Sequence, residues 1–428
     1  MNVSSKEDFS NYLNLQMVGK GTFSNVYLAT HKITNIPVAI KAVKKSTLEN
    51  SQVNRNFQRE LRIMHFVDFP FVTHYFNTLE DENYFYIIME YSKYGSLLDF
   101  LNKRGPFSEE AAQVIFCQFL AALNYLHNES HVLHRDLKME NILISSGSSI
   151  RLIDFGLSST FTEEDNLMET RCGSFPYAAP EIFQKKPYTA TVDMWSAGII
   201  LYTMVVGHLP FQDQNHKKLI QLICNEEPEY PEQLSSELID LLRGLLNKDR
   251  HQRLTVKEAS NHPWIRRSNY AFFASDFFIT QRQYRVIPKM TSEIDKDIVT
   301  KMRNYGYNLN NFEKDIIEMK ETAATTVYRM LKQEKITEMI RQQMTTNKDK
   351  EITRADSQPS QKLPPLMGND KCADSIIAPN MSRDSTAIVF KRNSMNKGQL
   401  EVILRKSRQP QSNRARPSSL NIVKKLNF

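Results

Sequence analysis

The sequence predicts an α+β fold in which a small strand-rich part precedes a larger helical part. Strand-like runs occur at Val26–Ala29, Val38–Val43 and Tyr84–Met89, separated by polar turns and by one helical pattern at Arg55–Phe66. From Ser108 onward the apolar residues recur with helical spacing, and this serine, followed by two glutamates, is a predicted N-cap. A chain of 428 residues with 41% hydrophobic residues can bury a substantial core. We therefore expect folded structure over most of its length.

The net formal charge of +7 is unevenly distributed along the chain. Residues 1–265 carry 25 basic and 31 acidic side chains, whereas residues 345–428 carry 16 basic and 7 acidic ones. A body with an acidic balance lacks the basic surface that nucleic-acid binding requires. We therefore expect no nucleic-acid partner for the folded body, and only the tail remains a candidate for contact with anionic lipid or RNA.

Cysteine usage and hydropathy indicate the compartment. The four cysteines stand far apart, so they form neither a disulfide framework nor a zinc or redox motif. The first residues lack a signal-peptide pattern, and no apolar run reaches the roughly 18 residues that span a bilayer. We expect a cytoplasmic protein, with the nucleus as the second candidate location.

Changes in composition and periodicity divide the chain into five segments. Residues 1–12 form an N-terminal extension, and residues 13–265 form the main folded domain, which ends where core-type residues become sparse after Trp264. Residues 266–292 are a linker, and residues 293–343 form a second helical pattern. Residues 344–428, rich in Ser, Asn, Gln, Lys and Arg, are predicted to be a largely disordered basic tail.

A glycine turn near the start of the main domain is the first candidate functional motif. In Gly19-Lys-Gly21-Thr-Phe-Ser24-Asn-Val26 the glycines would let backbone N–H groups approach phosphates closely. Because β-branched and aromatic residues follow the turn, we predict a strand–turn–strand hairpin over a nucleotide rather than a turn that opens a helix. An ordinary tight hairpin is the alternative.

A lysine and a glutamate form the second candidate. The strand Val38-Ala39-Ile40-Lys41 ends in an ammonium group that could pair with phosphate oxygens. Glu60 lies in the following helical pattern, where its carboxylate could hold that ammonium in place. A solvated surface glutamate is the alternative reading.

A polar loop after residue 133 supplies the decisive motif. The run His134-Arg135-Asp136-Leu-Lys138-Met-Glu140-Asn141 places a carboxylate and an amide five residues apart, and Asp154-Phe-Gly156 follows. Two oxygen ligands are thereby available for a hard divalent cation, and a further carboxylate remains free to receive a proton. Such a turn could arise by chance, but its order after the glycine loop and Lys41 and before Ala179-Pro180-Glu181 argues against chance.

Together these motifs resemble those of the eukaryotic protein kinases, over roughly residues 13–265. The resemblance implies a bilobal kinase fold, with a small β-rich lobe, a larger helical lobe and ATP bound between them. It further implies that Glu60 fixes Lys41 on the α- and β-phosphates, that Asp136 accepts the proton of the substrate hydroxyl, that Lys138 contacts the γ-phosphate, and that Asn141 and Asp154 hold Mg²⁺.

The resemblance also implies an adenine site. Apolar residues would sandwich the base, one would close the rear of the pocket, and the hinge backbone would hydrogen-bond the base. The implied nucleotide-binding residues are Val18, Gly19, Gly21, Val26, Ala39, Lys41, Met89, Glu90, Ser92 and Leu143.

Lys138 and the run from Thr170 to Glu181 resemble the serine/threonine class, and in particular its calmodulin-dependent and AMP-activated-kinase-related branch. The resemblance implies a non-specific serine/threonine protein kinase, and it implies that Arg253 pairs with Glu181. A pseudokinase or scaffold that acts through its helical segment and tail is the alternative. A non-catalytic relative usually loses part of the set formed by Lys41, Glu60, Asp136, Asn141 and Asp154, which is complete in this chain.

Arg135 beside Asp136 indicates regulation. In kinases of this kind that arginine pairs with a phosphate on the activation loop, and Thr170 is the matching position, so we predict activation by an upstream kinase. Ser24 stands where the third loop glycine is usual, and Ser96 stands where many relatives carry an acidic residue. Ser96 weakens the expectation that substrates carry arginine three residues before the acceptor, although Glu140 still offers a carboxylate to basic substrates.

Residues 293–343 predict three short helices with apolar positions Ile294, Ile298 and Met302, then Phe312 and Ile316, then Val327 and Leu331. The turn at residues 304–307 and the run at residues 325–328 resemble the ubiquitin-associated-type domain that follows the kinase domain in the AMP-activated-kinase-related branch. A generic amphipathic extension packed on the large lobe is the alternative. For residues 266–289, which mix phenylalanine with arginine, a calmodulin-type target is a further option.

Overall fold

The structure is a computed structural model that describes residues 8–21, 24–145, 148–160 and 174–355, with side chains up to residue 346. Two predictions concern residues that the structure does not describe. Thr170 and the tail beyond residue 355 lie outside the described residues, so the regulatory site and most of the predicted tail stay predictions.

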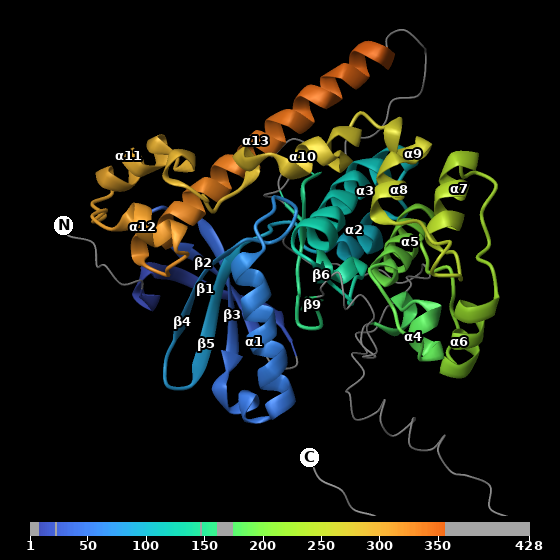
Figure 1. The fold of residues 1–428 in the computed structure, drawn as a ribbon, viewed down its shortest axis with the longest axis horizontal. Coiled ribbons are helices and arrows are strands. Elements are labelled where there is room, and N and C mark those ends of the chain that lie inside the picture. The colour runs from blue at the N-terminus through green and yellow to red at the C-terminus, as the bar shows by residue number, and fades with distance from the viewer. Residues whose placement is uncertain (1–7, 22–23, 146–147, 161–173, 356–428) are drawn as a thin grey trace, which may run out of the picture. The chain divides into compact units, whose positions relative to one another are not determined.

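The strand-rich first part forms a five-stranded antiparallel sheet with the order β1-β2-β3-β5-β4 (Figure 1). The predicted helix, α1, begins after Asn50, whose side chain caps it by accepting hydrogen bonds from the first turn. Phe57 and Ile63 of α1 share one buried cluster with Val43 and Ile87 of the sheet. The elements are β1 (Tyr12–Lys20), β2 (Ser24–His31), β3 (Pro37–Lys44), α1 (Ser51–Phe66), β4 (Tyr75–Glu80) and β5 (Tyr84–Glu90).

The helical second part begins with α2, and Ser108 caps α3 as predicted, by accepting a hydrogen bond from the backbone N–H of Ala111. Helix α5 is buried along most of its length, and Gly198 lets it approach α7, because a Cβ there would lie 2.9 Å from that of Leu245. The elements are α2 (Leu97–Arg104), α3 (Glu109–Asn124), β6 (Val132–Leu133), β7 (Ile142–Ile144), β8 (Ile150–Leu152), β9 (Ser159–Thr160), α4 (Pro180–Gln184), α5 (Thr191–Val206), α6 (His216–Asn225), α7 (Ser236–Leu245), α8 (Val256–Asn261) and α9 (Pro263–Arg266). The predicted α+β fold with two lobes is confirmed.

The predicted helical segment forms three helices, α11 (Lys296–Asn304), α12 (Phe312–Ile317) and α13 (Ala323–Ala355). Their apolar residues, among them Ile298, Phe312 and Val327, join a buried cluster with Val38 and Ile40 of the sheet. The segment therefore packs on the small lobe, on the face of the sheet opposite α1. The alternative of an extension packed on the large lobe alone is wrong for α11 and α12.

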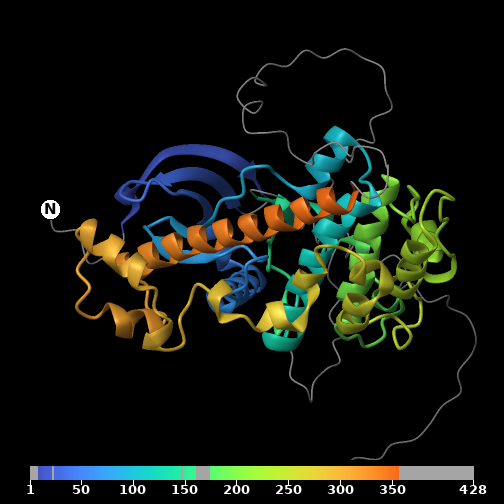
Figure 2. The same ribbon diagram turned by 90° about the horizontal axis from the view of Figure 1, so that it is seen from above.

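Helix α13 reaches both lobes (Figures 1 and 2). Val327 and Leu331, near its start, lie in the small-lobe cluster with Val38 and Ile40, and Ile336 and Ile340, further along, lie in the cluster that extends from α1 through the large lobe. The helix runs on to Ala355, so the predicted boundary at residue 343 falls inside it. The run beyond residue 343 contains Met, Lys, Glu, Arg and Ala and no Gly or Pro before residue 355, which allows the helix to continue.

The phenylalanines of the linker have a structural role. Phe273 and Phe278, which flank the start of α10 (Asp276–Thr280), are buried against Phe69 and Phe71 beyond the C-terminal end of α1. Phe277, by contrast, is 63% exposed. Because most of its apolar face is already buried, the linker in this arrangement does not present the free amphipathic helix that a calmodulin-type target requires.

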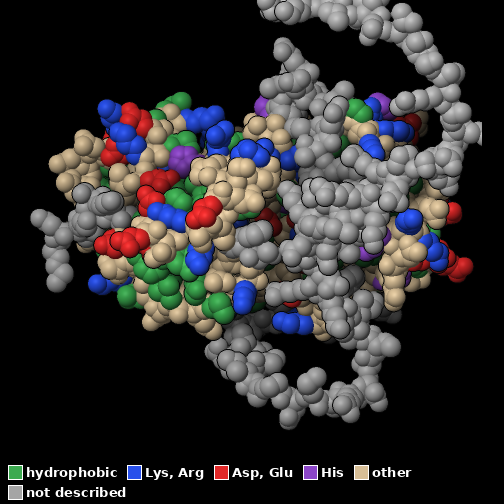
Figure 3. Space-filling model, turned by 90° about the horizontal axis from the view of Figure 1, so that it is seen from below, with side chains coloured by type: hydrophobic (Ala, Val, Ile, Leu, Met, Phe, Trp, Pro, Cys, Tyr) green, Lys and Arg blue, Asp and Glu red, His purple; other side chains and the backbone are tan. Residues whose placement is uncertain are grey.

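Charges of both signs are interspersed on one face of the described residues. Figure 3 shows acidic and basic side chains side by side on the face seen from below, with no continuous basic region among the described residues of that face. Among the described helices, none is both long enough and apolar enough to cross a membrane.

Candidate active site

Strand β3 and helix α1 bring Lys41 and Glu60 together as predicted, because the Nζ atom of Lys41 donates a hydrogen bond to the Oε1 atom of Glu60. Burial lowers the pKa of Lys41, but the carboxylates of Glu60 and Asp154 outweigh it and raise the pKa above its usual value. Lys41 therefore stays a cation in a site from which most water is excluded. Such a fixed cation suits a phosphate ligand.

Asp154 lies close to this pair. Burial raises its pKa, but the nearby positive charges of Lys41 and Lys138 outweigh that and hold the pKa below its usual value. The residue after next, Gly156, donates its backbone N–H to the Oδ1 atom of Asp154 at 3.3 Å. A Cβ at Gly156 would lie 3.2 Å from that oxygen and 3.7 Å from the Oε2 atom of Glu60, so a glycine leaves the two carboxylates room to approach each other.

Asp193 of α5 fixes the loop between β6 and β7 by hydrogen bonds. The carboxylate of Asp193 accepts hydrogen bonds from the backbone N–H groups of His134 and Arg135, both at 2.9 Å, and contacts the Nε2 atom of His127 at 2.8 Å. Asp193 is 1% exposed. This buried carboxylate fixes the backbone next to Asp136, where Arg135 takes a positive φ of 63°.

Asp136 is the centre of a compact polar cluster. The Nζ atom of Lys138 donates to its Oδ2 atom at 2.7 Å, and the hydroxyl of Ser174 donates to its Oδ1 atom at 2.8 Å. Lys138 also donates to the hydroxyl of Ser174 at 3.1 Å. A carboxylate held between a cation and a hydroxyl is oriented, so it can receive a proton from a third hydroxyl that comes into the site.

Asn141 and Asp154 are the predicted metal ligands. The Nδ2 atom of Asn141 donates to the backbone oxygen of Asp136 at 2.9 Å, which leaves its amide oxygen available to a cation. No group of three or more His, Cys, Asp or Glu side chains in the described part of the chain could hold a metal ion. One amide and one carboxylate oxygen fit Mg²⁺, which keeps several water or phosphate ligands. These residues therefore fit a magnesium ion that is shared with a phosphate-bearing ligand.

The pairing of neighbouring strands brings most predicted adenine-site residues together. Val26 of β2 pairs with Lys41, and Ala39 of β3 pairs with Met89 of β5. In the other lobe, Ser96 at the start of α2 forms an isolated bridge with Leu143 of β7, one of the residues that the resemblance implies for the adenine site.

The glycine turn joins β1 and β2 as the predicted hairpin. The backbone N–H of Gly21 donates to the oxygen of Ser24 at 2.7 Å, and Gly19 pairs with Val26. Val18, just before the turn, is 47% exposed, which leaves an apolar surface free for a planar base.

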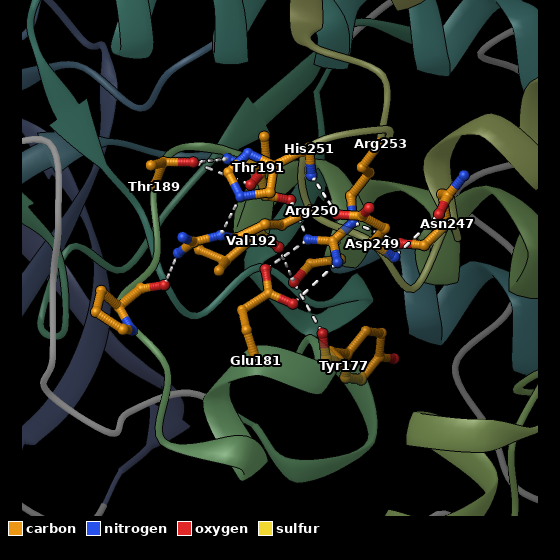
Figure 4. A network of polar contacts seen from close by, with 12 residues as sticks. Tyr177, Glu181, Thr189, Thr191, Val192, Asn247, Asp249, Arg250, His251 and Arg253 are labelled. Atoms are coloured by element: carbon orange, nitrogen blue, oxygen red, sulfur yellow. Dashed lines mark hydrogen bonds and ion pairs between the residues drawn. The ribbon is translucent and has the colours of Figure 1, made fainter.

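Glu181 and Arg253 form the predicted ion pair (Figure 4). The two terminal nitrogens of Arg253 donate to the two carboxylate oxygens of Glu181 at 2.7 and 2.9 Å. The side chains are 0% and 4% exposed. The pair anchors α4, and with it the segment from Ser174 onward, to the loop before α8.

Arg135, the predicted partner of a phosphate, donates from its Nε atom to the backbone oxygen of Leu157 at 2.7 Å and from its NH1 atom to the hydroxyl of Tyr188 at 3.3 Å. It thus contacts one residue that precedes Thr170 in the chain and one that follows it. That position is compatible with the predicted role, which depends on residues outside the described ones.

Two residues of the site were not predicted as functional. Ser174, 38 residues after Asp136, contacts its carboxylate, and Arg151 forms an ion pair with Glu90 of the hinge at 2.7 Å. For Ser174, the only indication of a role in the sequence was its position shortly before Ala179. The basic type of Arg151 within the apolar strand β8 could have indicated a buried ion pair, but not its partner.

The family model described as "Protein kinase domain" matches residues 12–265. The chain belongs to the protein kinase family. ATP and Mg²⁺ are the phosphate donor and the metal ion of this family, which agrees with the fit of Lys41, Asn141 and Asp154 to those groups. The matched residues agree closely with the predicted domain at residues 13–265.

Curated relatives of the kinase carry serine/threonine-kinase names. The chain is 32% identical over 321 residues to the SNF1-related protein kinase catalytic subunit alpha KIN12 of Arabidopsis thaliana, covering 75% of this chain and 63% of the relative. It is 38% identical over 257 residues to the probable serine/threonine-protein kinase MARK-A of Dictyostelium discoideum, covering 60% and 24%. It is 32% identical over 331 residues to the serine/threonine protein kinase OSK3 of Oryza sativa subsp. indica, covering 76% and 62%. The predicted family and branch are confirmed, and the kinase spans less than two thirds of the length of each of these relatives.

Proposed function

We propose that the kinase transfers the γ-phosphate of ATP to serine and threonine hydroxyls of proteins, with Mg²⁺ as the metal ion. The observation that carries this proposal is the cluster in which Lys138 and Ser174 hold Asp136 next to Asn141. Phosphoryl transfer needs positioned charges and one proton acceptor, and the described site supplies both. A pseudokinase usually loses part of the catalytic set, but every member of that set is present in this chain. We therefore do not favour the pseudokinase alternative.

In the proposed reaction, each polar residue has one task. Lys41, kept cationic by Glu60, binds phosphate oxygens of the donor. Asp136, oriented by Lys138 and Ser174, holds the hydroxyl of the acceptor and receives its proton. Asn141 and Asp154 hold Mg²⁺, which when bound neutralises charge on the phosphates. Lys138 places a further cation beside Asp136, where negative charge on the transferred group would be stabilised.

The proposed substrate class is serine- or threonine-containing protein, with basic residues near the acceptor as the finer proposal. Glu140 is exposed on the catalytic loop, and it lies within electrostatic range of Asp136 and Asp99. A group of carboxylates beside the acceptor site attracts lysine and arginine side chains of a peptide. We expect Glu140→Gln to lower kcat/KM for basic peptides more than for neutral peptides.

The proposed activator is an upstream kinase that phosphorylates Thr170. The arrangement of Arg135 supports this, because its guanidinium lies at the base of the segment that carries Thr170 and would gain a strong charge-assisted partner from a phosphate. We expect Thr170→Ala to lower turnover, and undiminished turnover would contradict the proposal.

We propose a cytoplasmic location, with the nucleus as the second candidate, and a tail that contacts anionic lipid or RNA. The cysteine pattern supports the first, and the excess of basic residues after residue 344 supports the second. Sedimentation of the full chain with phosphatidylserine vesicles, and its binding to labelled RNA, would distinguish the two tail partners.

The activity is tested by incubating the purified chain with Mg²⁺, ATP and a degenerate Ser/Thr peptide library, beside an Asp154→Ala variant. We expect phosphate transfer to serine and threonine in the unaltered protein and its loss in the variant. Transfer that is absent from both proteins, or equal in both, would overturn the proposed function.

A further inference from the structure

A buried ion pair connects the two lobes behind the hinge. Glu90 ends strand β5, and its Oε1 atom accepts a hydrogen bond from the Nε atom of Arg151 in β8 at 2.7 Å. The side chains of Arg151 and Glu90 are 1% and 10% exposed. A pair so buried is favourable only when the remaining donors and acceptors of both groups also find partners.

Helix α13 supplies those remaining partners. The Nε2 atom of Gln333 donates to the Oε2 atom of Glu90 at 2.8 Å, and the NH2 atom of Arg151 donates to the hydroxyl of Thr337 at 2.9 Å. The NH1 atom of Arg151 is satisfied within its own lobe, by Ser149. Gln333 and Thr337 are four residues apart, so they lie on one face of α13 and each completes one member of the ion pair.

The same ion pair closes a ring of contacts around the hinge. The chain leaves β5 at Glu90 and reaches Ser96, which forms a bridge with Leu143 of β7. Leu143 pairs with Arg151 of β8, and the guanidinium of Arg151 returns to Glu90. Glu90 and Leu143, both implied adenine-site residues, are therefore linked through a pair whose last two hydrogen bonds are made with α13.

Helix α13 is also anchored on both sides of this point. Leu331, before Gln333, is buried in the small-lobe cluster, and Ile340, after Thr337, is buried in the cluster that extends from α1 through the large lobe. Figure 2 shows the helix running from the small lobe to the large one. A continuous helix held at both ends resists rotation of one lobe against the other about the hinge.

We propose that Gln333 and Thr337 are positioning residues for nucleotide binding, acting through Arg151 and Glu90 on the hinge. This inference rests on the proposed function, because it takes the hinge as the place where adenine binds. It makes Gln333 and Thr337 of α13, which lie more than 60 residues beyond the end of the matched kinase domain, a part of the nucleotide site.

The test is the affinity of the full chain for Mg·ADP, measured by titration calorimetry. We expect the double variant Gln333→Ala/Thr337→Val to bind Mg·ADP about tenfold more weakly than the unaltered chain, about 1.4 kcal/mol. The matched control is Gln342→Ala/Thr345→Val on the same helix, where both side chains are exposed and contact only α13 itself. We expect the control to stay within about twofold of the unaltered chain.

A second variant separates hydrogen bonding from packing. Gln333→Met keeps the volume of the side chain but donates no hydrogen bond, so we expect it to weaken Mg·ADP binding as much as Gln333→Ala does. In the kinase assay, the KM for ATP should rise in the double variant and in Gln333→Met, while the KM for the peptide stays unchanged. A general loss of stability would lower the active fraction and leave both KM values in place.

Three results would overturn the inference. One is Mg·ADP affinity in the double variant within twofold of the unaltered chain, and another is recovery of that affinity in Gln333→Met. The third is an equal loss in the control. Because Mg·ADP binding requires no phosphate transfer, an unaltered chain that binds Mg·ADP but transfers no phosphate would contradict the proposed function alone. A chain that binds no Mg·ADP would contradict both.

Discussion

Replacing Arg253 by methionine tests how much the buried ion pair with Glu181 contributes to the large lobe. Four hydrogen bonds leave the guanidinium, two to the carboxylate of Glu181 and one each to the backbone oxygens of Asn247 and Thr191, at 2.7–3.0 Å (Figure 4). The ring of Trp195 lies 5.2 Å from the guanidinium carbon. Arg253→Met removes all of these contacts and leaves the carboxylate of Glu181 buried without a cation.

The expected cost follows from burial. Removing one partner of a buried ion pair costs about 3–5 kcal/mol, because the other charge stays desolvated and unpaired. Replacing both partners by apolar residues of similar volume removes that penalty. We therefore expect Arg253→Met to lower the free energy of unfolding by about 4 kcal/mol, and Arg253→Met/Glu181→Leu to recover about 2 kcal/mol of that loss.

Urea unfolding followed by tryptophan fluorescence measures these differences, since Trp195 is one of only two tryptophans and lies beside the replaced side chain. The matched control is Arg267→Met, which breaks an Arg–Glu pair with Glu237 whose side chains are 67% and 32% exposed. An exposed pair contributes less than about 1 kcal/mol. The reasoning is refuted if Arg253→Met costs no more than Arg267→Met, or if the double variant is no more stable than Arg253→Met.

The remaining predictions concern catalysis, pH and packing. Lys41→Met should abolish phosphate transfer in the peptide assay, and residual transfer near the normal rate would exclude Lys41 from phosphate binding. Burial raises the pKa of Glu321, but hydrogen bonds from His65 and Tyr75 outweigh this and hold it below the usual 4.5. The stability that Glu321 contributes is therefore present above about pH 4.5 and is lost as the pH falls through the lower folded value. Thermal unfolding of Glu321→Gln should show a deficit of about 1–2 kcal/mol at pH 7 that shrinks as the pH falls below about 4.5, and a deficit that is the same at every pH would contradict this. Ile336→Ala should cost about 2–5 kcal/mol in urea unfolding, because the side chain is 0% exposed in the cluster that extends from α1 through the large lobe, and a cost below about 1 kcal/mol would show that this part of α13 is not packed there.

Local sequence patterns predicted the elements that carry the catalytic residues. The glycine turn gave a hairpin because the residues on either side of it favour strands, and Ser108 gave a helix N-terminus because its hydroxyl satisfies a free backbone N–H group. Within the catalytic loop, Asp136, Lys138 and Asn141 are close in the sequence, so their contacts needed only the correct turn. Lys41 and Glu60 were paired by resemblance, and the packing of α1 on the sheet brings them together.

Such patterns could not predict contacts between residues that are far apart in the sequence. Periodicity showed that residues 293–343 form helices with apolar faces, but it could not tell which lobe those faces cover. The end of the helical segment was also placed too early, because helix-forming side chains without a cap or a glycine give no clear stop signal. The ion pair between Glu90 and Arg151 joins residues 61 positions apart, and neither position has a local signal for the other.

The sequence by itself determined the chemistry of this kinase, because the charge and hydrogen-bonding groups of Lys41, Asp136, Asn141 and Asp154 belong to the residues whatever their surroundings. The tertiary structure alone decided that α13 connects both lobes and completes the ion pair behind the hinge through Gln333 and Thr337. The physical reason is that an apolar helix face specifies only that it must be buried. The surface that buries it, and the polar groups that then meet, depend on how the whole chain packs.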